Sequence, residues 1–123
     1  MTAGIFWESN QYKMYTGGYS WTAAEEMCQL VGGHLASIAS LEENEVILNI
    51  TGGWSAWIGG SDTVRESFFV WSDGAPWNFH NFRDSRIITQ TSPSENCVYI
   101  FSTGRWNDLS CSSTMSAVCK GKY

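Results

Sequence analysis

Residues 20–43 read SWTAAEEMCQLVGGHLASIASLEE, a stretch with two helix starts separated by a glycine pair. A first helix is expected to begin near Ser20 or Thr22, because small hydroxyl side chains cap helix N-termini. It should end at Gly32-Gly33, since glycine favours the backbone geometry that follows a helix. The segment from His34 to Ile38 then has the small and apolar residues of a short strand.

The second helix is predicted to open at Ser40-Leu41-Glu42-Glu43, a capping box in which the serine hydroxyl and a later glutamate satisfy backbone N–H groups. It should end at Gly52-Gly53. In the first helix, Glu25 and Glu26 are assigned to the first turns, where the helix dipole favours anions. The apolar residues expected on the two helices are Ala23, Ala24, Met27 and Leu30, and Leu41, Ile47, Leu48 and Ile50.

Short apolar or β-branched runs in the rest of the chain predict strands. They span Lys13 to Thr16, His34 to Ile38, Ala56 to Gly59, Phe68 to Trp71, Cys97 to Phe101, Arg105 to Asn107 and Ala117 to Lys120. Two helices followed mainly by strands indicate an α+β fold, with the helices packed on small antiparallel sheets. The polar stretch from Arg83 to Asn96 predicts a long surface loop, and loops of this length are often functional.

Length and composition indicate a single domain over residues 1–123 with a dense aromatic core. The chain has 123 residues, enough for one hydrophobic core, and contains seven Trp, six Phe and five Tyr beside 15% charged residues. A net charge of −5 and scattered basic residues argue against nucleic acid and anionic membranes as partners. Because no apolar run is long enough to span a membrane and the start lacks a signal-peptide pattern, a soluble protein is expected.

Four cysteines, at positions 28, 97, 111 and 119, lack the paired C-x-x-C spacing of zinc sites, so two disulfides are expected. Sequence alone leaves three possible pairings. Disulfides persist in oxidising compartments, and Asn49-Ile50-Thr51 is an N-glycosylation sequon. Together these features favour a secreted glycoprotein.

Short motifs follow one another along nearly the whole chain. They are Ser20-Trp21-x-x-Ala24-Glu25-x-x-Cys28, Gly32 to Ile38, Glu42-Glu43-Asn44, Trp57 to Gly60, Phe69 to Gly74, Cys97, Trp106-Asn107-Asp108, Cys111 and Cys119. In this order they resemble the signature of C-type lectin-like domains. The resemblance implies bridges between Cys28 and Cys119 and between Cys97 and Cys111. It also implies the short form of the family, because the additional N-terminal cysteine pair of the longer form is missing.

The resemblance further implies a calcium-dependent carbohydrate site. In sugar-binding members a bound calcium ion coordinates two adjacent sugar hydroxyls, and the Glu and Asn ligands of the ion hydrogen-bond the same hydroxyls. Glu95, two residues before Cys97, and Asn107-Asp108 after Trp106 match the second half of this site. Their carboxylate and amide oxygens are the hard ligands that calcium prefers.

The first half of this site departs from the family pattern. Mannose-type binders carry Glu-Pro-Asn and galactose-type binders carry Gln-Pro-Asp, and neither tripeptide occurs in residues 83–94. The proline of this stretch, Pro93, is flanked by two serines, whose neutral hydroxyls are weak calcium ligands. Asp84 and Gln90 are the candidates for the missing oxygens.

Asp62 and Glu66 align with a carboxylate pair that feeds an auxiliary calcium site in some family members, and Asn96 stands where those members carry Asp. Alternatively, Asp62 and Glu66 are surface residues, because acidic pairs at this spacing are common. Similarly, Trp106 would anchor the core with or without a ligand, and Asn107-Asp108 could simply form a turn.

Residues 77–82 alternate aromatic and polar side chains, which indicates a small core beneath the long loop. Phe82 is assigned to that core, whereas Trp77 and Phe79 are either core residues or exposed rings that contact a ligand. His80 lies near the predicted site, but no nucleophile elbow, zinc-binding helix or phosphate loop accompanies it. The chain is therefore not expected to be an enzyme.

Two binding functions are compatible with these patterns. The first is calcium-dependent recognition of a carbohydrate or glycoprotein through an atypical site without the family tripeptide. The alternative is calcium-independent binding of a protein ligand through the long loop and its surroundings. Single sugar sites of this shallow kind bind weakly, so clustering of several domains would be needed for avidity.

Overall fold

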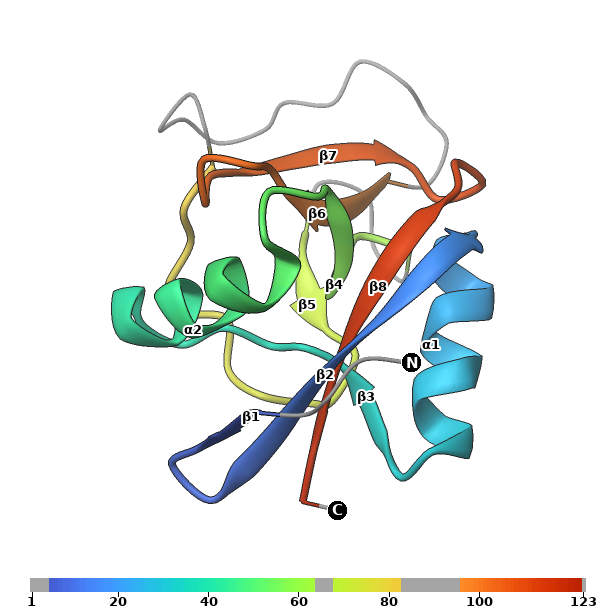
Figure 1. Cartoon of the computed structure of the whole chain (residues 1–123). Coiled ribbons are helices and arrows are strands. Elements are labelled where there is room, and N and C mark those ends of the chain that lie inside the picture. Colours follow the sequence, from blue (N-terminus) through green and yellow to red (C-terminus); the bar gives the residue numbers. More distant parts are fainter. Residues whose placement is uncertain (1–4, 64–67, 83–95, 123) are drawn as a thin grey trace.

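The computed structural model describes residues 5–63, 68–82 and 96–122 (Figure 1). Within them lie two helices and eight strands. In chain order these are β1 (Ile5–Trp7), β2 (Asn10–Tyr19), α1 (Trp21–Leu30), β3 (Gly33–Leu35), α2 (Leu41–Thr51), β4 (Ala56–Ser61), β5 (Val70–Trp71), β6 (Asn96–Ile100), β7 (Trp106–Ser110) and β8 (Met115–Gly121). The predicted α+β class and both predicted helices are confirmed. No sequence pattern had indicated β1.

Helix α1 begins where the capping pattern placed it. The Ser20 hydroxyl accepts a hydrogen bond from the backbone N–H of Ala23 at 3.2 Å. The prediction for Glu25 was wrong, because this residue lies beyond the first turn and is buried. Its carboxylate accepts the backbone N–H of Leu35 at 3.0 Å and lies 2.6 Å from His34 Nδ1. Glu25 therefore ties α1 to β3, and does not serve as a dipole-facing surface anion.

Helix α2 has a modified capping box. Ser40 Oγ accepts the N–H of Glu43 at 3.1 Å, while Glu43 Oε1 accepts the N–H of Ala39 at 2.8 Å, one residue before the cap. The helix ends at Gly52, whose φ of 59° is the left-handed conformation that glycine adopts easily.

The buried face of α2 differs from the prediction at its first residue. Leu41 is one of the apolar residues expected on this helix, but 55% of its surface is exposed. The buried residues of the helix are instead Glu43, Asn44, Ile47 and Thr51. These residues recur at helical spacing and define the inward stripe, and three of the four are polar. Polar groups inside the protein need partners, and the partners of Glu43 and Asn44 organise much of the fold.

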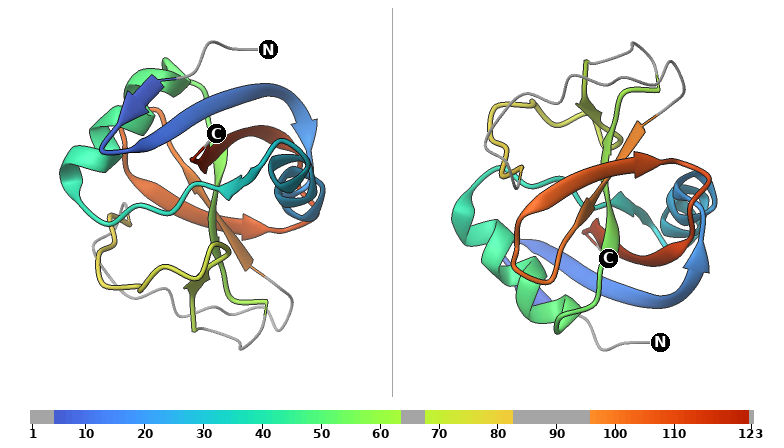
Figure 2. Two further views of the ribbon diagram at one scale, coloured as in Figure 1. Left: turned by 90° about the horizontal axis from the view of Figure 1, so that it is seen from below. Right: turned by 90° about the horizontal axis from the view of Figure 1, so that it is seen from above.

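The strands form one mixed sheet. The hydrogen-bonded order is β1-β2-β8-β4-β6-β7, with β3 also paired to β8 and β5 to β4. All these pairs are antiparallel except β4 with β8, where Ala56 lies opposite Ser116 and Trp57 opposite Ala117. The sequence had predicted small antiparallel sheets, and the parallel β4–β8 contact joins them into one. Figure 2 shows the two helices on opposite sides of this sheet.

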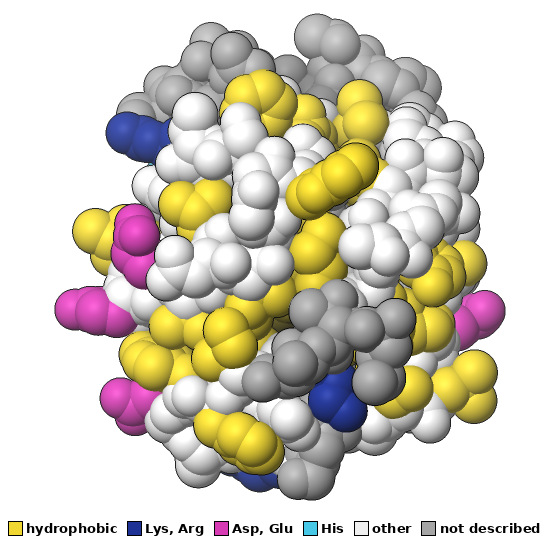
Figure 3. Space-filling model, in the orientation of Figure 1, with side chains coloured by type: hydrophobic (Ala, Val, Ile, Leu, Met, Phe, Trp, Pro, Cys, Tyr) yellow, Lys and Arg dark blue, Asp and Glu magenta, His cyan; other side chains and the backbone are white. Residues whose placement is uncertain are grey.

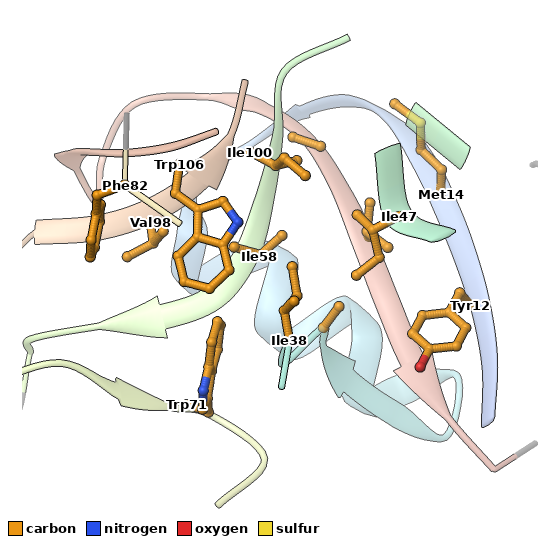
Figure 4. Close-up of a cluster of buried hydrophobic side chains, with 13 residues drawn as sticks. Tyr12, Met14, Ile38, Ile47, Ile58, Trp71, Phe82, Val98, Ile100 and Trp106 are labelled. Atoms are coloured by element: carbon orange, nitrogen blue, oxygen red, sulfur yellow. The ribbon is translucent and has the colours of Figure 1, made fainter. Parts of the chain in front are cut away.

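Two clusters of buried side chains fill the space between the sheet and the helices. One contains Ile47 of α2 together with Tyr12, Ile58 and Trp106 from three strands (Figure 4). The other contains Ala24 and Cys28 of α1 together with Leu35, Trp57 and Ala117. Neither of the described helices is long and apolar enough to cross a lipid bilayer.

Both disulfides have the pairing that the resemblance implied. Cys28 in α1 is bonded to Cys119 in β8, and Cys97 in β6 is bonded to Cys111, directly after β7. The described part of the chain contains no free cysteine. The first bridge closes a loop of 91 residues and the second a loop of 14. Closing such loops restricts the unfolded chain, which stabilises the folded state by about 3 to 5 kcal/mol per bridge.

Glu43 is the centre of a buried polar network. Its Oε2 accepts the Tyr12 hydroxyl at 2.6 Å and lies 2.5 Å from Lys120 Nζ. Lys120 also donates to the Ser37 hydroxyl at 3.0 Å. Burial and the hydrogen bond to Glu43 raise the pKa of Tyr12 far above its usual value, so Tyr12 stays protonated and donates. The network links α2 to β2 and β8.

Replacing Glu43 with Ala is expected to lower the free energy of unfolding by about 3 kcal/mol or more, since the Lys120 ammonium would lose its partner in a nearly buried position. Urea denaturation followed by fluorescence measures this change. Glu42→Ala removes the adjacent, exposed carboxylate and serves as the control. A loss for Glu43→Ala no larger than that of the control would contradict this role.

Candidate functional site

The candidate site is built on Trp106, the first residue of β7. Its side chain is fully buried, and its indole N–H donates to Asn44 Oδ1 at 2.7 Å. Asn44 uses its amide nitrogen as well, donating to the carbonyl of Gly104 at 2.8 Å. The same carbonyl accepts the side-chain amide of Asn81 at 2.9 Å. Helix α2, the turn before β7 and the segment before residue 83 therefore converge on one buried indole.

Aromatic rings surround Trp106 on the side of β5. The ring centroids of Trp71, Trp77, Phe79 and Phe82 lie 5.4, 6.0, 5.9 and 5.8 Å from that of Trp106, mostly in edge-to-face arrangements. Figure 4 shows Trp71 and Phe82 beside the Trp106 ring. Phe82 is buried, which confirms its predicted core role. Trp77 and Phe79, left open by the sequence, are half-buried and pack against this core.

Asn107 and Asp108 follow directly along β7. They pair with Tyr99 and Val98 of β6, and both are partly exposed. Successive side chains of a strand point to opposite faces, so one of the two must bend along the strand for both to reach one ion. Asn107 Oδ1 accepts the backbone N–H of Asp108 at 2.9 Å, which holds the Asn107 side chain against the backbone of β7. The two residues thus belong to β7 and not to a turn, which was the alternative interpretation.

Chemically, this arrangement offers oxygen donors. The carboxamide of Asn107 and the carboxylate of Asp108 belong to successive residues of β7, directly after the buried Trp106, and both groups are hard ligands suited to calcium. An amide oxygen that accepts one N–H retains a second lone pair for another partner. Leu109, 41% exposed, adds an apolar side chain next to them on the same strand.

Several predicted site residues lie outside the described part of the chain. These are Glu95 and Glu66, and the loop residues Asp84, Gln90 and Pro93. Asn96, the last residue of the predicted loop, is the first residue of β6. Within the described ranges, no three His, Cys, Asp or Glu side chains are grouped closely enough to hold a metal ion.

Asp62 and Asn96 do meet, as the predicted auxiliary site requires, but they also have a structural role. Asp62 Oδ1 accepts the backbone N–H of Asn96 at 2.8 Å, and Oδ2 accepts its side-chain amide at 3.3 Å. Only 3% of Asp62 and 5% of Asn96 is exposed, so the interpretation of Asp62 as a surface residue was wrong. These bonds fasten the start of β6 to the residue that follows β4.

Two other residues, His80 and Asn44, can be compared with what the sequence indicated. His80 is exposed, and its ring lies 5.8 Å from that of Phe82, so it extends the aromatic cluster. Asn44 was recognised only as part of a motif, and its hydrogen bond to Trp106 was missed. The available signal was a polar residue on the inward stripe of an amphipathic helix, which indicates a buried partner.

The comparisons with known proteins agree on one family. The family model described as Lectin C-type domain matches residues 17–121. A lectin of Pleurodeles waltl is 36% identical over 121 residues, which cover 91% of this chain and 70% of the lectin. The alpha-N-acetylgalactosamine-specific lectin of Patiria pectinifera is 35% identical, with 94% of this chain and 76% of that protein covered. The versican core protein of Rattus norvegicus is 37% identical over 89% of this chain, which spans only 4% of that much longer protein.

Two solved structures have the same fold as this chain. The cow carbohydrate-recognition domain of CD23, determined in the presence of an oligosaccharide, superimposes with a TM-score of 0.87 at 28% identity. That match covers 96% of this chain and 92% of the CD23 chain. A calcium-independent type II antifreeze protein superimposes with a TM-score of 0.86, also at 28% identity, with 95% and 89% covered.

Replacing Asn44 with Ala should lower the free energy of unfolding by about 2 to 3 kcal/mol, because the buried Trp106 N–H would have no acceptor. Equilibrium urea unfolding measures the loss. Glu45→Ala, at an exposed position on the same helix, is the matched control. Equal stability of the two variants would show that the Asn44 hydrogen bond does not hold this region.

Replacing Asp62 with Asn should destabilise the protein by about 1 to 3 kcal/mol even in the presence of a chelator, because two amide groups would then face each other at Asn96. Glu26→Gln makes the same chemical change at an exposed position. Thermal unfolding with and without calcium separates the two roles of Asp62. If the loss appears only when calcium is present, the structural role is refuted.

Proposed function

Because the chain belongs to the C-type lectin domain family, we propose that it is a secreted recognition module that binds carbohydrate through a calcium ion. In this proposal residues 1–123 form one module, and Glu95, Asn107 and Asp108 ligate the ion. The main supporting observation is the adjacency of Asn107 and Asp108 on β7, directly after the anchored Trp106. A rigid base for the ligands lowers the cost of ordering them when an ion binds.

The oxygen atoms of the three proposed ligands are of the kind that calcium prefers. Asn107 would supply an amide oxygen, while Asp108 and Glu95 would supply carboxylates, all hard donors. When bound, the ion would coordinate adjacent hydroxyls of a sugar. The Asn107 amide group can then donate to one sugar hydroxyl, and the Glu95 carboxylate can accept from the other. A second ion at Asp62, Glu66 and Asn96 stays a prediction.

The absence of the Glu-Pro-Asn or Gln-Pro-Asp tripeptide affects the expected affinity of the site for calcium. Calcium takes six to eight oxygen ligands, and three residues fill only part of that shell. The affinity for calcium should therefore be lower than that of a complete site, unless Asp84 or Gln90 contributes. Useful binding to a glycan-bearing surface would then depend on several modules acting together, as in an oligomer. A relative named for N-acetylgalactosamine specificity supports carbohydrate as the ligand class.

Two features support an extracellular location. The disulfides Cys28–Cys119 and Cys97–Cys111 are of the kind that persists in oxidising compartments. Asn49 of the glycosylation sequon is exposed on the last turns of α2, so its side chain is accessible to a glycan.

The second candidate function is calcium-independent binding of a protein ligand. It is favoured by the absence of both family tripeptides from residues 83–94 and by the similarity to a calcium-independent antifreeze protein. Exposed Leu109 and Phe68 supply apolar side chains of the kind that protein interfaces use.

A glycan array probed with clustered protein, with and without chelator, tests the leading proposal. Binding should require calcium and should fall at least tenfold, by about 1.4 kcal/mol, in Asn107→Ala and Asp108→Ala variants. Ser110→Ala, an exposed change on the same strand, should bind normally. Glycan binding that is absent or unchanged by chelator, with no thermal shift on adding calcium, would reject the proposal in favour of the protein-binding alternative.

A further inference from the structure

A shallow groove lies at the turn between α2 and β4. It has a volume of about 610 Å³ and is lined by Trp54, three glycines (Gly17, Gly52 and Gly53), two serines (Ser55 and Ser116) and one methionine. We call it the Trp54 groove. Both views in Figure 2 place the α2–β4 turn on the opposite side of the molecule from β5 and the segment that follows it. None of the described residues that line the groove comes from β7, so the groove does not include Trp106, Asn107 or Asp108.

Trp54 is the most exposed tryptophan of the chain. Its exposed fraction is 68%, whereas Trp21, Trp57, Trp71 and Trp106 are buried and the other two are half-buried. A hydrogen bond of 3.1 Å from its backbone N–H to the Thr51 carbonyl holds its backbone against the end of α2. Single exposed apolar side chains are common on protein surfaces. The Trp54 side chain is different because it also lines a groove.

The groove is uncharged in a chain with a net charge of −5. On the face drawn in Figure 3, the acidic side chains lie toward the left and right margins. The polar groups of the groove are serine hydroxyls and peptide groups. A Cβ atom added at Gly52 or Gly53 would meet no other atom within 4 Å, so the backbone at these residues is open to a ligand. Because none of its lining side chains carries a charge, the groove offers a charged ligand no ion-pair partner.

This lining matches the chemistry of a neutral sugar. A pyranose ring has one face of C–H groups, which can pack flat on an indole, and a rim of hydroxyls, which can pair with peptide groups and serine hydroxyls. The volume suits one or two sugar rings. A protein interface, by contrast, needs about 800 Å² on each partner with several buried anchors, and Trp54 would be the single aromatic anchor here.

We propose that the Trp54 groove is a second saccharide-binding subsite, which stacks a neutral pyranose on the Trp54 indole without calcium. A module with this subsite and a calcium site on β7 could hold two glycan chains at once. The subsite does not depend on Asn107, Asp108 or any metal ion.

Indole N–H signals in the NMR spectrum of ¹⁵N-labelled protein test this subsite. The protein is titrated with methyl β-galactoside and with N-acetylgalactosamine in excess chelator. The Trp54 signal, assigned by its loss in Trp54→Phe, should shift saturably with a Kd of about 1 to 10 mM. Trp54→Ala should weaken binding of the same sugar, followed by the backbone signals of Gly52 and Gly53, by about tenfold. Trp54→Phe, which keeps a ring, should lose less.

Two controls show whether a signal change comes from sugar bound in the groove. Phe6→Ala removes a comparably exposed aromatic side chain from β1 and should leave the titration unchanged. Glycerol at matched concentration controls for non-specific polyol effects. The proposal is overturned if the Trp54 signal does not saturate, if glycerol shifts it equally, or if Trp54→Ala binds normally.

A double variant, Asn107→Ala with Asp108→Ala, separates this subsite from the proposed calcium site. It should lose calcium-dependent glycan binding and keep the chelator-insensitive shift of the Trp54 signal. Failure of the calcium-site proposal and failure of this one are therefore distinguishable. Loss of the Trp54 shift in the double variant, with the fold intact, would contradict the independence of the two sites.

Discussion

The hydrogen bond from the Trp106 indole to Asn44 is the contact on which the organisation of this molecule depends. Both residues are almost completely inaccessible to water, so neither polar group has an alternative partner in the solvent. Asn44 satisfies the indole with its oxygen and the Gly104 carbonyl with its nitrogen. One helical side chain therefore sets the position of α2 relative to the turn before β7. Losing it would leave unsatisfied polar groups in the middle of the aromatic core.

The core also determines where the proposed calcium ligands on β7 lie. Because Trp106 is held by a hydrogen bond and by four neighbouring rings, the two residues after it begin from a fixed point on β7. Their backbone is further constrained by the ladder with β6 and by the Cys97–Cys111 bridge at its far end. Ligands on rigid elements are positioned before binding, so less of the binding energy is spent on ordering them. The stability of the core and the proposed function are coupled in this way.

The two proposed binding sites differ in their chemistry and share no residue. On β7, adjacent amide and carboxylate oxygens are suited to a cation and to the hydroxyls around it. At the end of α2, the Trp54 groove combines an exposed indole with uncharged hydroxyls and open peptide groups. Binding at the proposed β7 site would depend on charge and on a metal ion. Binding in the Trp54 groove would depend on apolar contact area and would need no metal ion. Between them, the buried Glu43 network and the Cys28–Cys119 bridge connect the helices to the central strands.

Features that depend on neighbours along the chain could be predicted from the sequence. The Ser20 and Ser40 caps, the helix end at Gly52 and the alternation of residues 77–82 follow from local backbone and packing rules, and the structure has them. The motif order indicated the family and, with it, the disulfide pairing. Tertiary structure alone decided the buried roles of Glu43, Asn44 and Asp62, the parallel β4–β8 contact and the exposure of Trp54. The physical reason is that a polar residue becomes an interior residue only when a distant partner satisfies it. For Asn44 that partner is 62 residues away, and the helical pattern indicates that a buried partner exists but not which residue it is.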